Sequence, residues 1–321
     1  MTGLFSYFVF FLILASIYAI MALGLNLQWG YTGLFNIGVV GFFAVGAYTF
    51  SILATPAQGG HLGGFNWPFI PAVLGAMVIT GVIALIIGFP TLRLRDDYLA
   101  IATIGTAASI QLVANNMSWL TGGSQGIYNI PQPLAGYFQS NLSYNVFFLI
   151  MMLVIVGLVY LGLQRMVNAP WGRVLMAIRE DETAAGSVGK NAFSYRLQSF
   201  VIGAILMGLS GAMYACFIKY ISPTLFLPIL TFQVWAMLIV GGSGSNLGAI
   251  VGAVLVWGLW TGSGTVVMSI LPAGLQVKGG AIQIVLIGLV LMLALLFRPR
   301  GIMGERKAIA AERARSKISQ G

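Results

Sequence analysis

Residues 168–191 read NAPWGRVLMAIREDETAAGSVGKN, a polar stretch between two long apolar blocks. The stretch holds three of the chain's seven acidic residues, together with Arg173, Arg179 and Lys190. Charged side chains are costly in hydrocarbon, so we expect this stretch to lie outside the membrane. It therefore separates the membrane segments that precede it from those that follow.

Two short helices are predicted within this stretch. Asn168 can cap the first helix, which would carry residues 171–178, and Pro170 suits its first turn. The acidic run at 180–182 places negative charge where a second helix begins, and Gly189 can end that helix in a left-handed turn. The second helix would be short and exposed.

Ala184 and Ala185 would give this second helix a small, flat face. Small side chains allow the groove of another protein to close tightly over a helix backbone. Composition alone leaves open the alternative that the stretch is an ordinary solvated loop.

The composition is that of a membrane protein. Charged residues make up 7% of the 321 residues, apolar residues 59%, and the mean hydropathy is +0.94. We therefore predict an all-α, polytopic membrane protein. The net charge of +9 is read as a membrane-surface effect, so nucleic acid is not an expected partner.

The chain lacks the residues that catalysis in a membrane requires. Cys216 is the single cysteine and lies in an apolar block, and His61 is the single histidine and lies in a glycine-rich loop. No apolar block contains an acidic residue. We expect no catalytic residue, no bound metal and no enzyme activity in this chain.

Nine apolar blocks are long enough to cross about 30 Å of hydrocarbon, so about nine spans (8–10) are predicted. They cover residues 4–25, 34–53, 69–89, 98–117, 145–163, 197–218, 225–240, 247–268 and 281–297. The second block is rich in glycine and can bend or re-enter, and the seventh is short and contains Pro228.

Lysine and arginine set the expected orientation. With residues 168–191 inside, the cytoplasmic segments hold two, five and seven basic residues, which is 14 of the chain's 16. This bias predicts an external N-terminus and a cytoplasmic C-terminus. No basic residue precedes the first apolar run, so we expect a retained span rather than a cleaved signal peptide.

Two regions follow from this layout. Residues 1–297 would form a single transmembrane domain that includes the cytoplasmic loop 164–196. Residues 298–321 would form a basic cytoplasmic tail near anionic lipid headgroups. A cluster at 93–97 of two arginines and two aspartates either anchors the membrane boundary or meets the polar loop.

Uncharged polar residues occur in or beside several spans. Buried amides cost energy unless they are paired, so they either bridge helices or face a polar pathway. A small, weakly polar stripe on the fourth block can line such a path or receive a neighbouring helix. The candidate pathway residues are Asn26, Asn36, Thr103, Thr106, Ser109, Gln111 and Asn115. Gly244, Gly248 and Gly252 form a four-residue ladder that predicts close helix packing.

Five stretches together resemble one family. They are ALGLNLQWGYTGLFNIG, GFFAVGAYT, LRLRDDYLAIATIG continuing to LTGGSQGI, the polar stretch GRVLMAIREDETAAGSVGKN, and VGGSGSNLGAIVGAVL. They occur in the expected order over most of the chain. The chain resembles the LivM-type permease subunit of bacterial branched-chain amino acid ABC importers.

The resemblance implies a multi-pass permease domain in the bacterial inner membrane, working by alternating access. Its partners would be a second, homologous permease, two cytoplasmic ATPases and an extracytoplasmic binding protein. ATP and Mg would be bound by the ATPases and no cofactor by this chain. The residues implied to couple to the ATPases are Arg179, Glu180, Asp181, Glu182, Ala184, Ala185 and Gly189.

Some alternatives remain open from sequence. The substrate would be a branched-chain or other neutral amino acid, but the same architecture would also suit urea or a short amide. A self-contained secondary transporter or a passive channel would not need the polar loop as an ATPase contact. The segment GSVGKN at 186–191 lacks the glycine and the Ser or Thr that a phosphate-binding loop requires.

Overall fold

The computed structural model describes residues 2–56, 62–94, 96–270, 279–297 and 301–303. The long helices, in chain order, are α1 Thr2–Leu25, α2 Val39–Ala54, α3 Phe69–Thr91, α4 Asp96–Asn116, α6 Asn141–Asn168, α9 Ala192–Ile218, α10 Pro228–Gly241, α11 Asn246–Ile270 and α12 Gly279–Phe297. The shorter elements are the π-helix η1 Asn26–Tyr31, α5 Ser118–Thr121, η2 Gly123–Gln125, β1 Ile127–Tyr128, η3 Ala135–Tyr137, α7 Pro170–Glu180, α8 Glu182–Ser187, β2 Tyr220–Ile221 and η4 Pro223–Leu225.

The prediction of a polytopic all-α membrane protein is confirmed. Among the described residues, seven helical segments are long and apolar enough to cross a membrane, and α2 is a shorter apolar helix of 16 residues. Every predicted apolar block overlaps one of the long helices that the structure describes. The number of spans and their orientation stay predictions.

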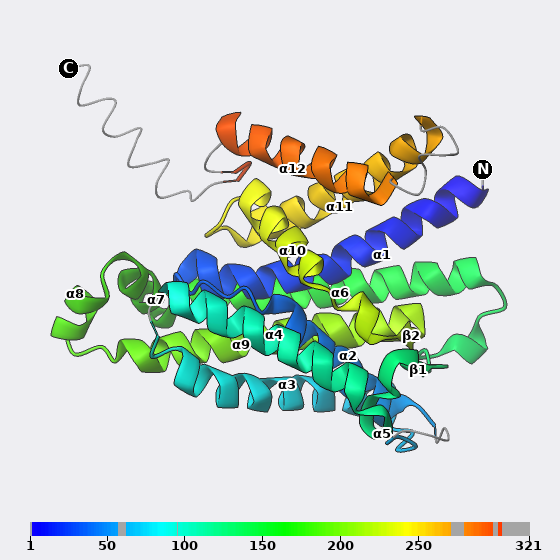
Figure 1. Ribbon diagram of the computed structural model, residues 1–321, viewed down its shortest axis with the longest axis horizontal. Helices are drawn as coiled ribbons and strands as arrows, with labels where there is room; N and C mark the ends of the chain where they lie inside the picture. Colours follow the sequence, from blue (N-terminus) through cyan, green and yellow to red (C-terminus); the bar gives the residue numbers. More distant parts are fainter. Residues whose placement is uncertain (1, 57–61, 95, 271–278, 298–300, 304–321) are drawn as a thin grey trace.

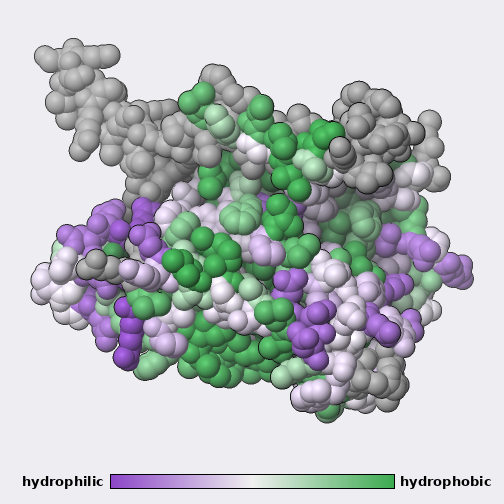
Figure 2. Space-filling model, in the orientation of Figure 1, coloured by the Kyte–Doolittle hydropathy of each residue, from purple (hydrophilic) through white to green (hydrophobic). Residues whose placement is uncertain are grey.

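The helices run roughly along a common direction, and the two ends of the bundle differ (Figure 1). Helices α7 and α8 lie at one end, whereas the first residues of α1 and the strands β1 and β2 lie at the opposite end. The strands pair antiparallel, with Ile127 opposite Ile221. On the face that Figure 2 shows, hydrophilic residues gather at these two ends and apolar ones between them.

Helices α1 and α9 form the centre of the bundle. In their most apolar windows, 78% and 72% of residues are buried, compared with 22% in α6. Small residues permit this close packing, because a Cβ on Gly24 would lie 2.6 Å from the Gly203 carbonyl oxygen. Figure 1 shows α3 at the edge of the bundle, where its apolar side chains can face lipid.

The second apolar block differs from its prediction. Helix α1 continues through η1 to Tyr31, residues 32–38 are not helical, and α2 begins only at Val39. Gly33 has φ +78°, a conformation that favours glycine, and this turn redirects the chain. We refer to residues 26–38 as the interrupted segment. The bend that the glycines of this block allow therefore lies before its helix, whereas re-entry stays a prediction.

One further prediction, the Asn168 cap, is wrong. Asn168 is the last residue of α6 and does not cap α7. Pro170 disfavours helical geometry in the residue before it, so Ala169 is extended with ψ 169° and separates the two helices. The predicted tail, 298–321, lies outside the described residues except for 301–303, whose Ile302 and Met303 N–H groups donate to the end of α10.

Candidate coupling and translocation site

Helices α7 and α8 lie within the polar stretch, residues 168–191. Asp181 caps α8, because its carboxylate accepts hydrogen bonds from the N–H groups of Ala184 at 3.0 Å and Thr183 at 2.9 Å. These bonds, together with one from the Thr183 hydroxyl, lower the pKa of Asp181 below its ordinary value. Gly189 has φ +77° and ends the helix, as predicted.

Helix α8 is tied to the membrane helices on one side. Glu182 forms an ion pair of 2.9 Å with Arg196 of α9, whose side chain is only 15% exposed. Ala184 is exposed, but Ala185 is 5% exposed and faces the bundle. The predicted flat face of Ala184 and Ala185 is therefore wrong, since adjacent residues point about 100° apart on a helix. Val188, which directly follows α8, is 72% exposed.

Arg179 points inward, from the end of α7 toward the interrupted segment. One of its guanidinium nitrogens donates a hydrogen bond to the carbonyl oxygen of Gly30 in η1. Its aliphatic part packs on Gly33, where a Cβ would lie 3.1 Å from the Arg179 Cγ. Glu180, the next residue, is exposed. Arg179 thus joins the polar loop to the interrupted segment.

Asn26 fixes the start of the interrupted segment to α11. Its Nδ2 donates to Asn246 Oδ1 at 2.9 Å, and its Oδ1 accepts from the Gly244 N–H at 2.9 Å. Asn246 in turn donates to Gln164 of α6 at 3.2 Å. A buried amide was expected either to bridge helices or to face a polar pathway, and the geometry of Asn26 is that of a bridge.

Asn36 fixes the other end of the segment. Its Nδ2 donates to Gln28 Oε1 at 2.8 Å, and its Oδ1 accepts from the Gly38 N–H at 2.7 Å. The Trp235 Nε1 of α10 donates to the Asn36 carbonyl oxygen at 3.0 Å. Thr103 of α4 also binds this region, because its hydroxyl accepts from the Ile37 N–H at 3.1 Å.

The other candidate pathway residues lie further along α4. Thr106 is half-buried and donates to the Ala102 carbonyl, whereas Ser109 and Asn115 are exposed. Gln111 is half-buried and donates to the Pro223 carbonyl at 3.1 Å. The structure therefore divides the predicted set into a buried group that holds the interrupted segment and a group nearer the surface of α4.

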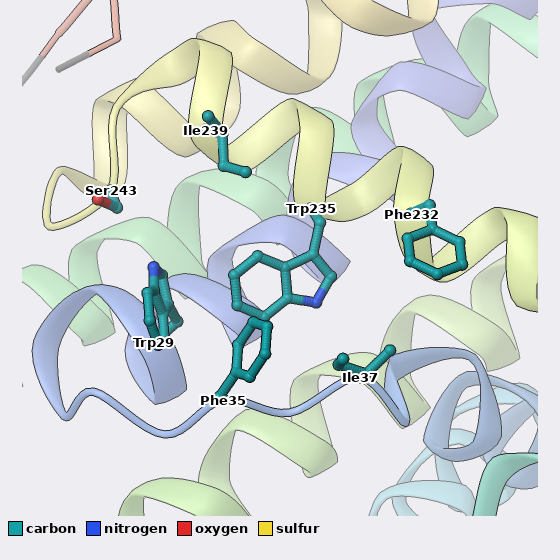
Figure 3. A pocket seen from close by; sticks show the side chains of 7 residues that line it. All are labelled: Trp29, Phe35, Ile37, Phe232, Trp235, Ile239 and Ser243. Atoms are coloured by element: carbon teal, nitrogen blue, oxygen red, sulfur yellow. The ribbon is translucent and has the colours of Figure 1, made fainter. Parts of the chain in front are cut away.

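An aromatic pocket that sequence reasoning missed lies between the interrupted segment and α10 (Figure 3). Its volume is about 550 Å³, and its lining residues are Trp29, Phe35, Ile37, Phe232, Trp235, Ile239 and Ser243. The signal available in the sequence was the presence of large aromatic residues close to the glycines of residues 26–38. A second hollow of about 10 Å³ lies between α4 and α10.

The predicted glycine ladder is only partly helical. Gly248 and Gly252 lie on α11 against α10, and a Cβ on Gly248 would lie 2.7 Å from the Gly241 carbonyl oxygen. Gly244 precedes α11 and has φ +80°, so it does not continue the ladder. A helix with all three glycines would displace the Gly244 N–H from Asn26.

No group of three or more His, Cys, Asp or Glu residues that could hold a metal occurs among the described residues. The described residues instead form a chain of contacts from the surface to the pocket. An exposed helix, α8, adjoins α7, which is bonded through Arg179 to Gly30 in η1, at the start of the interrupted segment beside an apolar pocket. Such an arrangement can transmit a movement from the surface to the pocket wall.

Comparison with known proteins gives a consistent result. The family model described as "Branched-chain amino acid transport system / permease component" matches residues 7–295. The chain is 31% identical to the high-affinity branched-chain amino acid transport system permease protein LivM of Escherichia coli, over 90% of this chain and 68% of that protein.

Two further relatives extend this likeness. The probable branched-chain amino acid transport permease protein LivM of Methanocaldococcus jannaschii is 26% identical, over 91% of this chain and 92% of that protein. The permease protein LivH of Escherichia coli is 26% identical, over 76% of this chain and 80% of that protein. No solved structure matches the chain significantly.

Proposed function

Because the chain belongs to the family of branched-chain amino acid transport permease components, we propose that it is the membrane subunit of an ATP-binding-cassette importer for branched-chain or other neutral amino acids. It is a multi-pass inner membrane protein. The proposal adds that import proceeds by alternating access and that separate ATPases bind ATP and Mg. A second, homologous permease and an extracytoplasmic binding protein complete the complex.

The observation that carries this proposal is the hydrogen bond from Arg179 of α7 to the Gly30 carbonyl of η1. In the proposed mechanism, an ATPase docks on the outer surface of α8, formed by Ala184 and Val188, with Glu180 and Asp181 setting the local charge. Docking movements then reach α7, which is joined to α8 by the single residue Asp181. The hydrogen bond from Arg179 to Gly30 carries them into η1.

The interrupted segment is suited to receive such a movement. Its non-helical residues 32–38 can change direction at less cost than a continuous helix, while the bonds at Asn26 and Asn36 anchor its two ends. The ion pair between Glu182 and Arg196 transmits the same displacement to α9. Thus one docking surface acts on two of the helices that build the core.

A secondary transporter is the competing mechanism. Coupling to protons or sodium usually requires an ionisable residue in the membrane, and none of the apolar blocks contains Asp, Glu or His. The chain therefore has no evident site for such an ion, and the energy is assigned to the ATPase partners.

Affinity purification of the tagged chain from its native membrane in mild detergent tests this assignment. Mass spectrometry is expected to find two ATPase subunits and a second permease in stoichiometric amounts, and their recovery should fall when Ala184→Trp is introduced. The Ala184→Ser variant is the matched control and should retain them. Recovery of the chain alone, from cells that still take up the amino acid, would refute the proposal.

A further inference from the structure

We propose that the aromatic pocket holds the apolar side chain of the transported amino acid on its way through the membrane. This inference rests on the proposed function and names the part of this chain that contacts the substrate. The pocket is formed by Trp29, Phe35 and Ile37 of the interrupted segment on one side and by α10 on the other (Figure 3).

The chemistry of the pocket selects an uncharged, apolar group. Three of the four aromatic residues that line it are in edge-to-face or tilted contact, with centroids 5.2 Å apart for Trp29 and Phe35, 5.3 Å for Trp29 and Trp235, and 5.0 Å for Phe35 and Trp235. The Trp235 N–H is already bonded to the Asn36 carbonyl. Among the described residues that line the pocket, Ser243 supplies the single hydroxyl group and none is charged.

The size also fits a small organic ligand. A volume of about 550 Å³ lies within the range of about 300 to 1,000 Å³ that is usual for small-molecule sites. The ammonium and carboxylate of an amino acid would remain at the open mouth of the pocket, where water or the second permease can solvate them. Urea and short amides have little apolar surface to bury here and are disfavoured as substrates.

The backbone that forms one wall argues against a lipid as the occupant. Residues 32–38 are not helical, and irregular backbone at membrane depth is tolerated where it is buried in protein or lines a water-filled cavity, but not against lipid. Substrate sites of transporters are typically built from such discontinuous helices. The pocket mouth therefore faces an aqueous path or a partner subunit.

A second, much smaller hollow lies beside the pocket along α10. Ile37 lines both of them, and the second hollow is also lined by Gln111 of α4 and Thr231 of α10. From Thr231 to Ile239 the helix advances about 12 Å, at about 1.5 Å per residue. The two hollows thus lie one after the other along α10.

One wall of the pocket is attached to the polar loop. Trp29 lies directly before Gly30, whose carbonyl accepts the hydrogen bond from Arg179. A shift of α7 therefore moves Trp29 relative to Trp235, which is held on α10. This connection provides a way for ATPase movements to change the shape of the substrate pocket.

Thiol labelling of the assembled importer in proteoliposomes tests whether the pocket meets the substrate path. In a Cys216→Ala background, Ile239→Cys is expected to react with a charged methanethiosulfonate reagent, and saturating leucine with the binding protein should slow the reaction at least threefold. Ile86→Cys, an exposed position on α3 that is 63% accessible, is the lipid-facing control and should stay unreactive. Labelling of Ile239→Cys no faster than this control, or unaffected by leucine, would overturn the inference.

A transport experiment tests the side-chain assignment. Ile239→Trp fills the pocket, whereas Ile229→Trp makes the same change on α10 at a residue that lines neither hollow. One methylene in an apolar pocket changes selectivity by about tenfold, so the ratio of leucine to valine uptake should fall by about tenfold in Ile239→Trp alone. This ratio does not depend on the amount of folded complex.

The outcomes separate the two levels of the proposal. A wild-type complex that takes up no neutral amino acid would refute the proposed function. A wild-type complex that takes up leucine, combined with an unchanged leucine-to-valine ratio in Ile239→Trp, would refute the pocket assignment only.

Discussion

The link between Arg179 and Gly30 makes the sharpest prediction. In Arg179→Gln the charged donor is lost, and a hydrogen bond from a charged group is worth about 1.5 to 3 kcal/mol. Since about 1.4 kcal/mol corresponds to a tenfold change in an equilibrium, η1 should follow α7 about ten times less often. Leucine uptake per ATP hydrolysed should therefore fall about tenfold, while ATP hydrolysis itself continues.

The assay measures both quantities on the same proteoliposomes, which contain the whole importer and its binding protein. Arg173→Gln is the matched control, because it removes an exposed arginine from the same helix. Arg179→Lys keeps the charge but lacks the planar guanidinium, so it should restore only part of the coupling.

Gly33→Ala disturbs the same contact from the opposite side. A residue with a Cβ at φ +78° costs about 1 to 2 kcal/mol, and here the Cβ would also lie 3.1 Å from Arg179 Cγ. It should lower uptake per ATP in the same way as Arg179→Gln. Equal ratios of uptake to hydrolysis in Arg179→Gln and Arg173→Gln would refute the role of Arg179.

Three other predictions concern the loop and the interrupted segment. Ala184→Trp should abolish ATP-driven uptake by blocking the docking surface while membrane insertion, measured by immunoblotting of membranes, is retained; normal uptake would contradict this. Asp181→Ala should speed amide hydrogen exchange in α8, whereas Asp181→Asn, which keeps a capping oxygen, should not. The pKa of Asp181 is lowered in the folded chain, so its stabilising effect is present above the unfolded value of 3.8 and is lost as pH falls through the lower folded value. A strong change in the amide exchange of α8 that is caused by titration of Asp181 near pH 6 would contradict the cap. Asn26→Ala removes the partner of the half-buried Gly244 N–H and of the buried Asn246 Oδ1, which costs about 1 to 3 kcal/mol, and should lower the melting temperature of the complex in detergent; an unchanged melting temperature would argue against the bridge.

Residues close in sequence were sufficient to predict the long helices and part of the polar stretch 168–191. The apolar blocks each overlap a long helix because about 20 apolar residues without charge have few alternatives in a membrane. Negative charge at the start of α8 and glycine after its end were also predicted, and the structure shows Asp181 as the cap and Gly189 with positive φ. These features depend on neighbours close in sequence.

The rest of the site depends on contacts between distant residues. Asn26 meets Asn246, and Arg179 meets Gly30, across more than a hundred residues of sequence. Sequence patterns could not show that Arg179 points inward. Nor could they show that Ala185 is buried, because that depends on how α8 packs against the bundle.

The aromatic pocket is the clearest case of this limit. Trp29 and Trp235 lie in separate elements, and each alone resembles an ordinary core residue. The interruption of the helix between Tyr31 and Val39 creates the space between them. The glycine-rich block indicated that a helix could be interrupted, but it did not indicate that aromatic side chains would surround the interruption.

The central claim is that this chain moves a neutral amino acid with energy supplied by ATPase partners. Radiolabelled leucine uptake by proteoliposomes containing the complete complex tests it most directly, with ATP and a protonophore varied independently. We predict that uptake requires ATP on the side of the membrane where α8 lies, and that uptake persists when the protonophore is present. Uptake that continues without ATP and is abolished by the protonophore would contradict it.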